Sequence, residues 1–348
     1  MTASLEQAPA PGQGGRAGLG PEEGGGVGVS PAAAGGRIPD FFIVGNPKSG
    51  TTALYEMLRR HPAIYMPALK EPHFFAADEI PPRADSAPRS VAPSPDVLPR
   101  TLDEYLALFA AARPDQRAGE ASPSYLRSPV AAGRIAQLAP GARIVAILRE
   151  PASFVRSLHL QHLQDHIEVE RDLRRAIAQE EHVRDGRTVL RYSERVRYVE
   201  QLRRFHELFG RARVLVLIYD DFRAANVATV RRVLRFLEVD DGVAVAPLEA
   251  NPTVRMRSVR LARLTLAVRT GRGPLGRALN GSIRALTSER MRAGAMRVVR
   301  GRVLYAAPLP PDEALMLGLR RRFAPEVVAL SEYLGRDLVS LWGYDGLG

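Results

Sequence analysis

The sequence predicts an α/β fold in which helices cover both faces of a central parallel sheet. Short apolar runs occur at 41–44, 143–148 and 214–218, and each is followed by a segment with helical periodicity. The runs are apolar throughout instead of alternating with polar residues, which is typical of strands buried on both faces. Strands of this kind that alternate with helices indicate a three-layer α/β/α architecture.

The first predicted strand, 41–44, ends at Gly45. A turn rich in Gly, Ser and Thr follows it, and a helix is predicted at 53–60. The pattern predicts a strand, a loop and a helix in succession.

The middle of the chain carries two clear helix starts. Thr101 can cap a helix through Phe109, because Glu104 three residues later completes a capping box. The strand at 143–148 leads into a helix that begins at Pro151, whose fixed φ suits a first helical turn. Both starts support the alternation of helices and strands.

The remaining helices lie in the second half of the chain. A long amphipathic helix is predicted at 192–209, and Gly210 ends it. After the third strand, Asn226 is expected to cap a helix. The C-terminal stretch 311–334 has helical periodicity.

Composition bounds the class of protein. The 348 residues include 45% hydrophobic residues, enough for one large α/β domain, predicted at 37–348. Residues 1–36, rich in Gly, Ala and Pro, are expected to form a disordered tail, and the Pro-rich stretch 80–100 a long surface loop. The absence of cysteine excludes disulfides, thiolate nucleophiles and iron–sulfur clusters. We find no apolar run of about 18–20 residues and no signal-peptide pattern, so a cytoplasmic protein is expected.

The net charge of +11 is concentrated in one segment. Residues 255–302 hold thirteen arginines and a single acid, Glu289, so the rest of the chain sums to about −1. The segment 255–305 is predicted to be helical, and three interpretations of its charge stay open: a solvated basic face, peripheral contact with anionic lipid headgroups, or attraction of an anionic acceptor. Aromatic residues for stacking on bases are scarce there, so we expect no nucleic-acid partner.

The most informative motif is Gly45-Asn46-Pro47-Lys48-Ser49-Gly50-Thr51-Thr52. Glycines five apart, after a strand and before a helix, form a loop whose N–H groups converge on an anion. The spacing is that of a nucleotide-triphosphate loop, G-x-x-x-x-G-K-(S/T), except that the lysine lies three residues earlier. Since the chain has only two lysines, Lys48 and Lys70, the position of Lys48 inside this loop is informative.

Pro47 to Thr52 after a strand resembles the 5′-phosphosulfate loop of the sulfotransferases that use 3′-phosphoadenosine 5′-phosphosulfate (PAPS). The resemblance implies a P-loop-like fold, PAPS as co-substrate and no metal. It also implies that the donor contacts come from Pro47, Lys48, Ser49, Gly50, Thr51 and Thr52, and that Lys48 stabilises the bridging oxygen as the sulfuryl group leaves.

A second motif of the same family pairs an arginine at the end of a strand with a serine eight residues later. Here Arg149 follows the strand at 143–148, and Ser157 lies in the next helix. The resemblance implies that both bind the 3′-phosphate, for which a guanidinium fork and a hydroxyl are suitable donors. The usual family Asn before the proline is Glu150 here, and we expect this acid to point away from the anion.

Lys70-Glu71-Pro72-His73-Phe74-Phe75 resembles the K-E-x-(H/Q)-F-F segment of the heparan-sulfate-type and bacterial members. The resemblance implies that Glu71 is the general base, with Lys70 as its electrostatic partner beside the substrate and His73 orienting the acceptor or Glu71. The alternative is that Glu71 forms only a solvated ion pair with Lys70. The two aromatic side chains are expected to pack in the core.

Residues 119–125 resemble the family's E-K-S-P-x-Y segment, which implies that Ser122 lies near the acceptor. Ala121 stands where many members have a lysine, so that second catalytic lysine is missing. His159 and His162 follow the second motif and are expected to be ordinary helix histidines.

These motifs predict a PAPS-dependent sulfotransferase acting on a hydroxyl or amine of a lipid, a glycan or a small metabolite. Two alternatives stay open. One is a P-loop kinase that uses ATP, for which Asp220 and Asp221 are conceivable magnesium ligands. The other is a polyanion-binding protein that acts through residues 255–302.

Overall fold

The computed structural model describes residues 36–76, 98–165, 167–180, 191–244, 246–248 and 310–347, together with the backbone of 255–256 and 305–306. The prediction of a disordered tail therefore concerns residues outside the described ranges, apart from Gly36, as does nearly all of the Pro-rich loop. The Arg-rich segment 255–305 is described only at its ends, which are strands, so the prediction of a helix is wrong at those positions. Two short antiparallel strands, β6 Arg255–Met256 and β7 Tyr305–Ala306, pair with each other.

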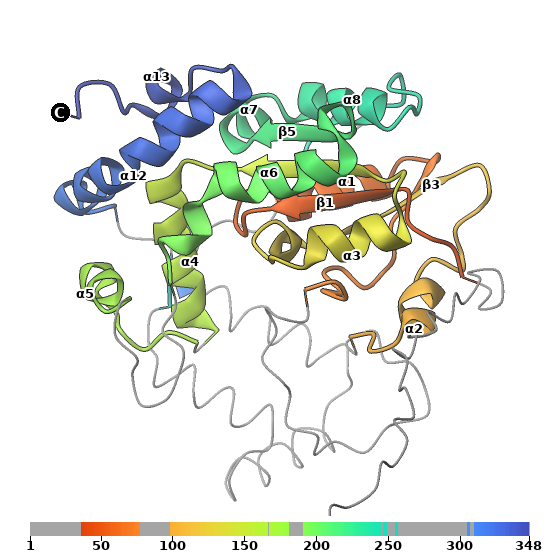
Figure 1. The fold of residues 1–348 in the computed structure, drawn as a ribbon, viewed down its shortest axis with the longest axis horizontal. Coiled ribbons are helices and arrows are strands. Elements are labelled where there is room, and N and C mark those ends of the chain that lie inside the picture. The colour runs from red at the N-terminus through yellow and green to blue at the C-terminus, as the bar shows by residue number, and fades with distance from the viewer. Residues whose placement is uncertain are drawn as a thin grey trace, which may run out of the picture.

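The core of the molecule is a five-stranded sheet in the order β2-β3-β1-β4-β5, with every pairing parallel (Figure 1). The strands are β1 Phe41–Gly45, β2 Ile64–Tyr65, β3 Arg117–Ala121, β4 Arg143–Leu148 and β5 Val214–Ile218. The predicted parallel sheet is confirmed, with the three apolar runs as its centre and one edge. The strands β2 and β3 lack an apolar run in sequence, and they owe their place to pairing with each other and with β1.

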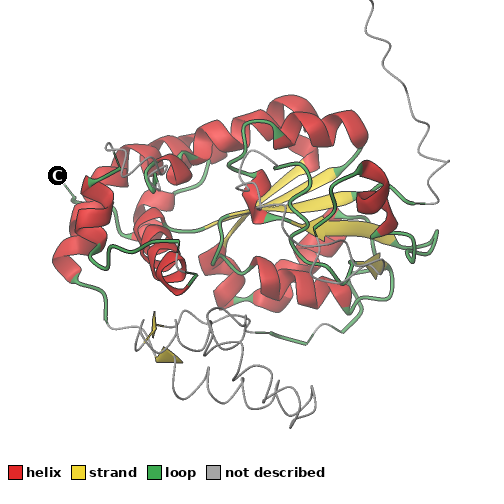
Figure 2. Ribbon diagram, turned by 90° about the horizontal axis from the view of Figure 1, so that it is seen from below, coloured by secondary structure: helices red, strands yellow, loops and turns green. Residues whose placement is uncertain are grey.

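Helices cover both faces of the sheet, so the three-layer prediction is confirmed (Figure 2). Alternate strand residues point to opposite faces. Phe41, Ile43 and Val145 pack with α1 Thr51–Arg59 and α8 Asn226–Phe236 on one face. Phe42, Val44 and Ile144 pack on the other face with α3 Ala131–Leu138, α4 Pro151–Gln164, α6 Tyr198–Phe209 and α12 Glu313–Leu334. The smaller helices are α2 Leu102–Ala107, η2 Pro123–Tyr125, α5 Leu173–Ala178, η3 Glu194–Val196, η4 Arg211–Arg213, α7 Tyr219–Ala224 and α13 Leu338–Trp342.

Most predicted helix starts agree with the structure. Thr101 accepts a hydrogen bond from the backbone N–H of Glu104, and the Glu104 carboxylate accepts one in return from Thr101, which completes the capping box before α2. Pro151 is the first residue of α4, and Gly210 follows the last residue of α6 with φ 75°. These local signals depend on neighbours in sequence, and for that reason they could be predicted.

Two helix predictions were wrong in detail. The helix expected at 192–209 is broken at Arg197, whose ψ of 64° is not helical, and the side-chain amide of Gln201 donates to two carbonyls of the preceding turn η3. Asn226 is the first residue of α8 and makes no capping bond; Ala225 occupies the N-cap position. In both places, contacts within the fold decide where the helix begins.

The C-terminal helices close the structure against the carboxyl end of β5. Trp342 of α13 donates from Nε1 to Asp220 at 2.9 Å. Arg336, between α12 and α13, donates two hydrogen bonds to Asp221, at 2.6 and 2.8 Å. No helix among the described residues is long and apolar enough to cross a membrane.

Candidate active site

The loop between β1 and α1 has a backbone shape that needs its glycines. We call residues 45–52 the phosphate loop. Gly45 has φ 144°, and a Cβ built there would lie 2.3 Å from the carbonyl oxygen of Ile147 on β4. Gly50 has φ 86° and packs against Phe222, which leaves no room for a side chain. Lys48 also adopts a left-handed conformation, φ 62°, which is costly for a side chain with Cβ and is typical of functional loops.

The same loop leaves polar groups without partners inside the described structure. Gly50 is the N-cap of α1 and has no side chain, so no side-chain cap serves the N–H groups of the first turn. Ser49 is fully buried, and its hydroxyl has no hydrogen-bond partner; the same holds for Oδ1 of Asn46, a residue that is 3% exposed. Together with the positive end of the helix dipole, these groups give the loop the chemistry that suits an anion.

Arg149 lies directly beside the phosphate loop. It follows β4, and its Nη1 donates to the carbonyl oxygen of Lys48 at 2.7 Å. The guanidinium stacks on Tyr219, 4.8 Å from the ring centre, while the Tyr198 hydroxyl donates to the Arg149 carbonyl at 2.9 Å. Burial lowers the pKa of Lys48, the Arg149 charge lowers it further, and Asp165 partly offsets both. The two cations gain free energy when an anion binds between them.

The residues around Arg149 agree in part with the second motif. Ser157 is 2% exposed in α4, two turns after Arg149. Glu150 caps α4: its carboxylate accepts hydrogen bonds from Ala152 N at 2.9 Å and Ser153 N at 2.6 Å, and the Tyr344 hydroxyl also donates to it. The expectation that Glu150 is directed away from the anion is therefore supported, because helix capping and Tyr344 use its oxygens.

The second group of predicted residues gathers in what we call the acceptor-side segment, residues 70–76. Glu71 forms an ion pair with Lys70, and its other oxygen lies 3.6 Å from Nε2 of His73. The ion pair that was the alternative interpretation of Glu71 is thus present, but it comes together with a histidine contact. Burial lowers the pKa of His73, and Glu71 counteracts that shift. Phe75 is buried and Phe74 stacks on Tyr105, as expected.

Hydrogen bonds attach the acceptor-side segment to the carboxyl end of β3. Glu71 N donates to the Ala121 carbonyl at 3.2 Å, and His73 N donates to Oγ of Ser122 at 3.2 Å. The ring Nδ1 of His73 lies 2.7 Å from Oγ of Ser124. Glu71 and His73 both have positive φ, 59° and 54°, a strain that these contacts must hold in place.

The sheet brings the phosphate loop, Arg149 and the acceptor-side segment to one edge. Ser122 N donates to the Ile43 carbonyl of β1 at 3.1 Å, so the end of β3 lies beside the strand that enters the phosphate loop. The carboxyl ends of β3, β1 and β4 therefore carry Ser122, the phosphate loop and Arg149 side by side, with Lys70, Glu71 and His73 held above β3. A hydrogen bond links the Arg149 side chain to the Lys48 backbone.

Sequence reasoning missed three residues of this site. Tyr219 supports Arg149, Ser124 fixes the His73 ring, and Glu120 lies fully buried beneath the acceptor-side segment. Tyr219 directly follows the third apolar run, and Ser124 and Glu120 lie in the motif that contains Ser122. Their position next to recognised signals was the only clue available from sequence.

The two histidines of α4 lie within the helical layer. Nε2 of His159 lies 2.8 Å from the Glu170 carbonyl oxygen. His162 packs against Tyr192, and its buried Nδ1 has no partner among the described residues. Burial, helped by Arg195 and Arg127, lowers the pKa of His162 to about 3, so the ring is neutral. These contacts fit structural histidines, as expected.

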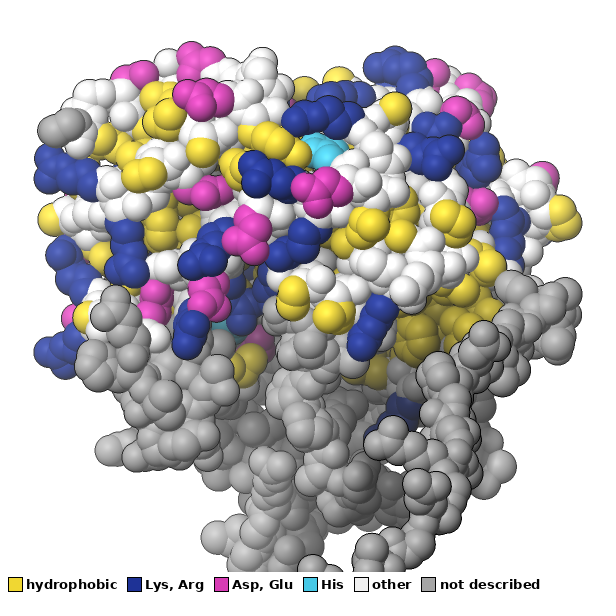
Figure 3. Space-filling model, in the orientation of Figure 1, with side chains coloured by type: hydrophobic (Ala, Val, Ile, Leu, Met, Phe, Trp, Pro, Cys, Tyr) yellow, Lys and Arg dark blue, Asp and Glu magenta, His cyan; other side chains and the backbone are white. Residues whose placement is uncertain are grey.

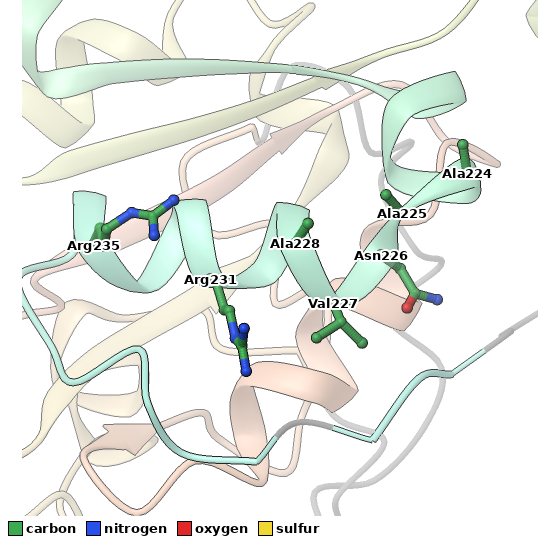
Figure 4. Close-up of a pocket in the computed structure, with 7 residues that line it drawn as sticks. All are labelled: Ala224, Ala225, Asn226, Val227, Ala228, Arg231 and Arg235. Atoms are coloured by element: carbon green, nitrogen blue, oxygen red, sulfur yellow. The ribbon is translucent and has the colours of Figure 1, made fainter.

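Elsewhere the described surface offers less to a ligand. Basic and acidic side chains are interspersed on the face seen in Figure 3, in keeping with the balanced charge outside 255–302. A cavity of about 620 Å³ lies along α8, where Val227 and Arg231 point to the same side (Figure 4). Its lining residues include none from the phosphate loop or the acceptor-side segment. The described residues contain no group of three or more His, Asp or Glu that could hold a metal ion.

The fold defines a class: an α/β protein with a P-loop-like strand–loop–helix at the carboxyl edge of a parallel sheet, with Arg149 bonded to the loop. Comparison with known proteins gives the family. The sulfotransferase family matches residues 39–242, which is more than half of the chain. This chain therefore belongs to the sulfotransferase family.

Similar proteins agree with this assignment. The chain is 30% identical over 127 residues to human heparan sulfate glucosamine 3-O-sulfotransferase 3B1, and 53% identical over 38 residues to human carbohydrate sulfotransferase 15. These matches cover 36% and 11% of this chain, but only 27% and 7% of those relatives. A crystal structure of a sulfotransferase from Alicyclobacillus acidocaldarius superposes with a TM-score of 0.58 at 27% identity, covering 87% of this chain and 98% of that one.

Proposed function

We propose that this enzyme transfers the sulfuryl group of PAPS to a hydroxyl or amine of a lipid, a glycan or a small metabolite. The observation that carries the proposal is the phosphate loop: an uncapped helix start, buried unpartnered groups on Asn46 and Ser49, and the Lys48 cation, all beside Arg149. A loop with its lysine inside suits a 5′-phosphosulfate better than a triphosphate. Pro47, Gly50, Thr51 and Thr52 shape this donor site.

In the proposed reaction the acceptor oxygen or nitrogen attacks sulfur, and the bond from sulfur to the bridging phosphate oxygen breaks. Glu71 takes the proton of the acceptor, and Lys48 stabilises the charge that develops on the leaving phosphate oxygen. His73, oriented by Ser124, directs either the acceptor or Glu71. Lys70 and Ser122 border the acceptor.

Arg149 and Ser157 are proposed to bind the 3′-phosphate of the donor. Arg149 already bridges to the phosphate loop through the Lys48 carbonyl, and stacking on Tyr219 fixes the plane of its guanidinium. A guanidinium held in one plane gives a bidentate contact to phosphate at a small cost in side-chain entropy. Ser157 is buried in α4, the helix that follows Arg149, and can add a hydroxyl.

The kinase alternative finds less support. Its conceivable magnesium ligands, Asp220 and Asp221, accept hydrogen bonds from Trp342 and Arg336. A polyanion-binding role and peripheral membrane contact rest on residues 255–302, outside the described side chains, and stay predictions. Because the similar relatives are named for carbohydrate and heparan sulfate acceptors, glycans are the first acceptors to test.

A thermal-shift titration tests the donor site. We expect adenosine 3′,5′-bisphosphate, without magnesium, to raise Tm, since a ligand at about 100 times its Kd stabilises a protein by about 2.7 kcal/mol. Arg149→Ala should lose most of this shift. Arg143→Ala is the matched control, because Arg143 begins the same strand at its opposite end, where it pairs with Glu238. Stabilisation by ATP with magnesium alone would favour the kinase instead.

A further inference from the structure

Glu120 is a buried acid that the proposed reaction does not use. It lies on β3, opposite Phe42 of β1 in the sheet register, and is 0% exposed. Among the described residues, neither carboxyl oxygen of Glu120 has a hydrogen-bond partner, and no cation forms an ion pair with this side chain. A carboxylate left in this state would pay a large desolvation cost, so the site favours the neutral acid.

The pocket around Glu120 is built of aromatic rings and hydroxyl groups. Phe75 packs edge-on against the rings of Tyr105 and Tyr125, with centres 5.1 and 5.6 Å apart. The hydroxyls of Tyr105, Tyr125 and Ser122 are near enough to Glu120 to affect its pKa, but they do not hydrogen-bond to it. The Tyr105 hydroxyl has no hydrogen-bond partner among the described residues. Burial raises the pKa of Glu120 to about 8, although these hydroxyls oppose the shift.

Two of these hydroxyls also hold the acceptor-side segment. Oγ of Ser122 accepts from His73 N at 3.2 Å, and the Tyr125 hydroxyl accepts from Phe75 N at 3.4 Å. The hydroxyls of Ser122 and Tyr125 therefore lie between Glu120 and two backbone amides of the segment that carries Glu71. That segment needs support, because Glu71 and His73 both have positive φ.

We propose that Glu120 is a positioning residue: as a neutral acid it leaves the hydroxyls of Ser122 and Tyr125 to the backbone amides of the acceptor-side segment, and so supports the strained backbone of that segment. The inference rests on the proposed function only in naming Glu71 as the base. An ionised Glu120 would attract those O–H groups and place an unpaired charge in the pocket. The acceptor-side segment would then lose part of its support.

Several other titratable and charged groups face this pocket. Tyr105 comes from α2 and Tyr125 from η2, and burial raises the pKa of both hydroxyls far above the neutral range. The charged groups near it include Lys70, Glu71 and His73 in the acceptor-side segment, Arg127 after η2, and Arg134 of α3, which donates to the Phe75 carbonyl at 3.4 Å. Burial lowers the pKa of His73, Glu71 raises it, and Arg127 and Lys70 lower it again.

Hydrogen exchange of backbone amides tests the proposal without any ligand or acceptor. Protection factors of the His73 and Phe75 amides are measured by NMR between pH 6.5 and 9 in the native enzyme, Glu120→Gln and Glu120→Ala. We expect the native protection to fall about tenfold as pH rises through about 8, and that of Glu120→Gln to stay level, because the amide is a neutral replacement. Glu120→Ala should lose about tenfold at every pH.

Glu180→Gln provides the matched control. Glu180 is also a buried acid, but it accepts from Ser193 N and pairs with Arg322, away from the acceptor-side segment. This variant should leave His73 and Phe75 protection unchanged. Equal loss in Glu120→Gln and Glu120→Ala, or a loss in β1 and β4 as large as in 70–76, would overturn the proposal. If Glu120→Ala does not fold, the pH comparison between the native enzyme and Glu120→Gln decides it.

The exchange result is independent of the donor. If the bisphosphate does not raise Tm, the proposed function is refuted, while the exchange pattern expected for Glu120 is unaffected. If nucleotide binding is normal but the protection of the two amides in the native enzyme does not change between pH 6.5 and 9, only the proposed role of Glu120 is refuted.

Discussion

At the scale of single residues, the site is built from side chains whose neighbours set their chemistry. Burial and Arg149 lower the pKa of Lys48, which makes an incoming anion its natural partner. Glu71 lies between Lys70 and His73, and burial lowers the pKa of the His73 ring. This setting suits Glu71 to the proposed role of general base.

Lys48→Ala should lower turnover by about two orders of magnitude or more, because the developing charge on the leaving oxygen loses its cation. Transfer of labelled sulfate from PAPS to acceptors in a lysate measures this. The Tm without ligand should change little, since the lysine lies in a loop. Turnover equal to that of the native enzyme would show that Lys48 has no such role.

Glu71→Gln should lower turnover by about two orders of magnitude while the bisphosphate-induced rise in Tm is retained. The amide keeps the size of the side chain but cannot take a proton. Glu56→Gln is a suitable control, since Glu56 pairs with Arg59 on exposed α1 surface. A full loss of nucleotide binding in Glu71→Gln would contradict a role on the acceptor side.

At the scale of elements, the link from β1 to α1 depends on close packing between neighbouring strands. Gly45 ends β1 directly against the β4 backbone, and Asn46 N donates to the Ile147 carbonyl at 2.9 Å. The phosphate loop therefore starts from a fixed point on the sheet. Its shape follows from this contact as much as from its own residues.

Gly45→Ala should destabilise the fold by about 1–3 kcal/mol, the usual cost of overpacking, because the new Cβ would meet backbone that cannot move aside. Urea unfolding measures the change. Gly133→Ala, in the interior of α3 with open space around it, should instead stabilise by about 0.5–1 kcal/mol. A Gly45→Ala variant as stable as the native enzyme would show that the loop tolerates a shift.

At the scale of the whole molecule, buried titratable groups make stability depend on pH in opposite directions. The pKa of His162 is lowered to about 3, so its contribution is present above its ordinary value of 6.5 and is lost as pH falls below it. The pKa of Glu120 is raised from 4.5 to about 8, so stability falls as pH rises between these values. The two slopes cancel between pH 4.5 and 6.5, so we expect stability from these two groups to be level there and to fall both below pH 4.5 and above pH 6.5.

His162→Phe should separate these effects. The phenyl ring fills a similar space against Tyr192 and replaces a nitrogen that has no partner. Relative to the native enzyme, the variant should gain about 2 kcal/mol more stability at pH 5 than at pH 7, because the native ring resists protonation in that range. Urea unfolding at both pH values measures it, and an equal difference at both would contradict the low pKa.

Much of the site could be predicted because its motifs are local. The phosphate loop, its lysine and the arginine after β4 each depend on a few consecutive residues after an apolar strand. Tyr219, Ser124 and Glu120 could not be predicted, because their roles come from contacts with distant segments. The break at Arg197 belongs to the same group, since Gln201 and buried neighbours fix it.

The sequence by itself determined the three apolar strands β1, β4 and β5, the helices that follow them and the identity of the residues in the phosphate loop, since apolar runs and turn residues act over short distances. Only the tertiary structure decided that β2 and β3 join the sheet and that β3 carries the acceptor-side segment to the edge where the loop lies. Strand pairing and burial are set by residues far apart in the chain, and so is the protonation of a buried acid such as Glu120.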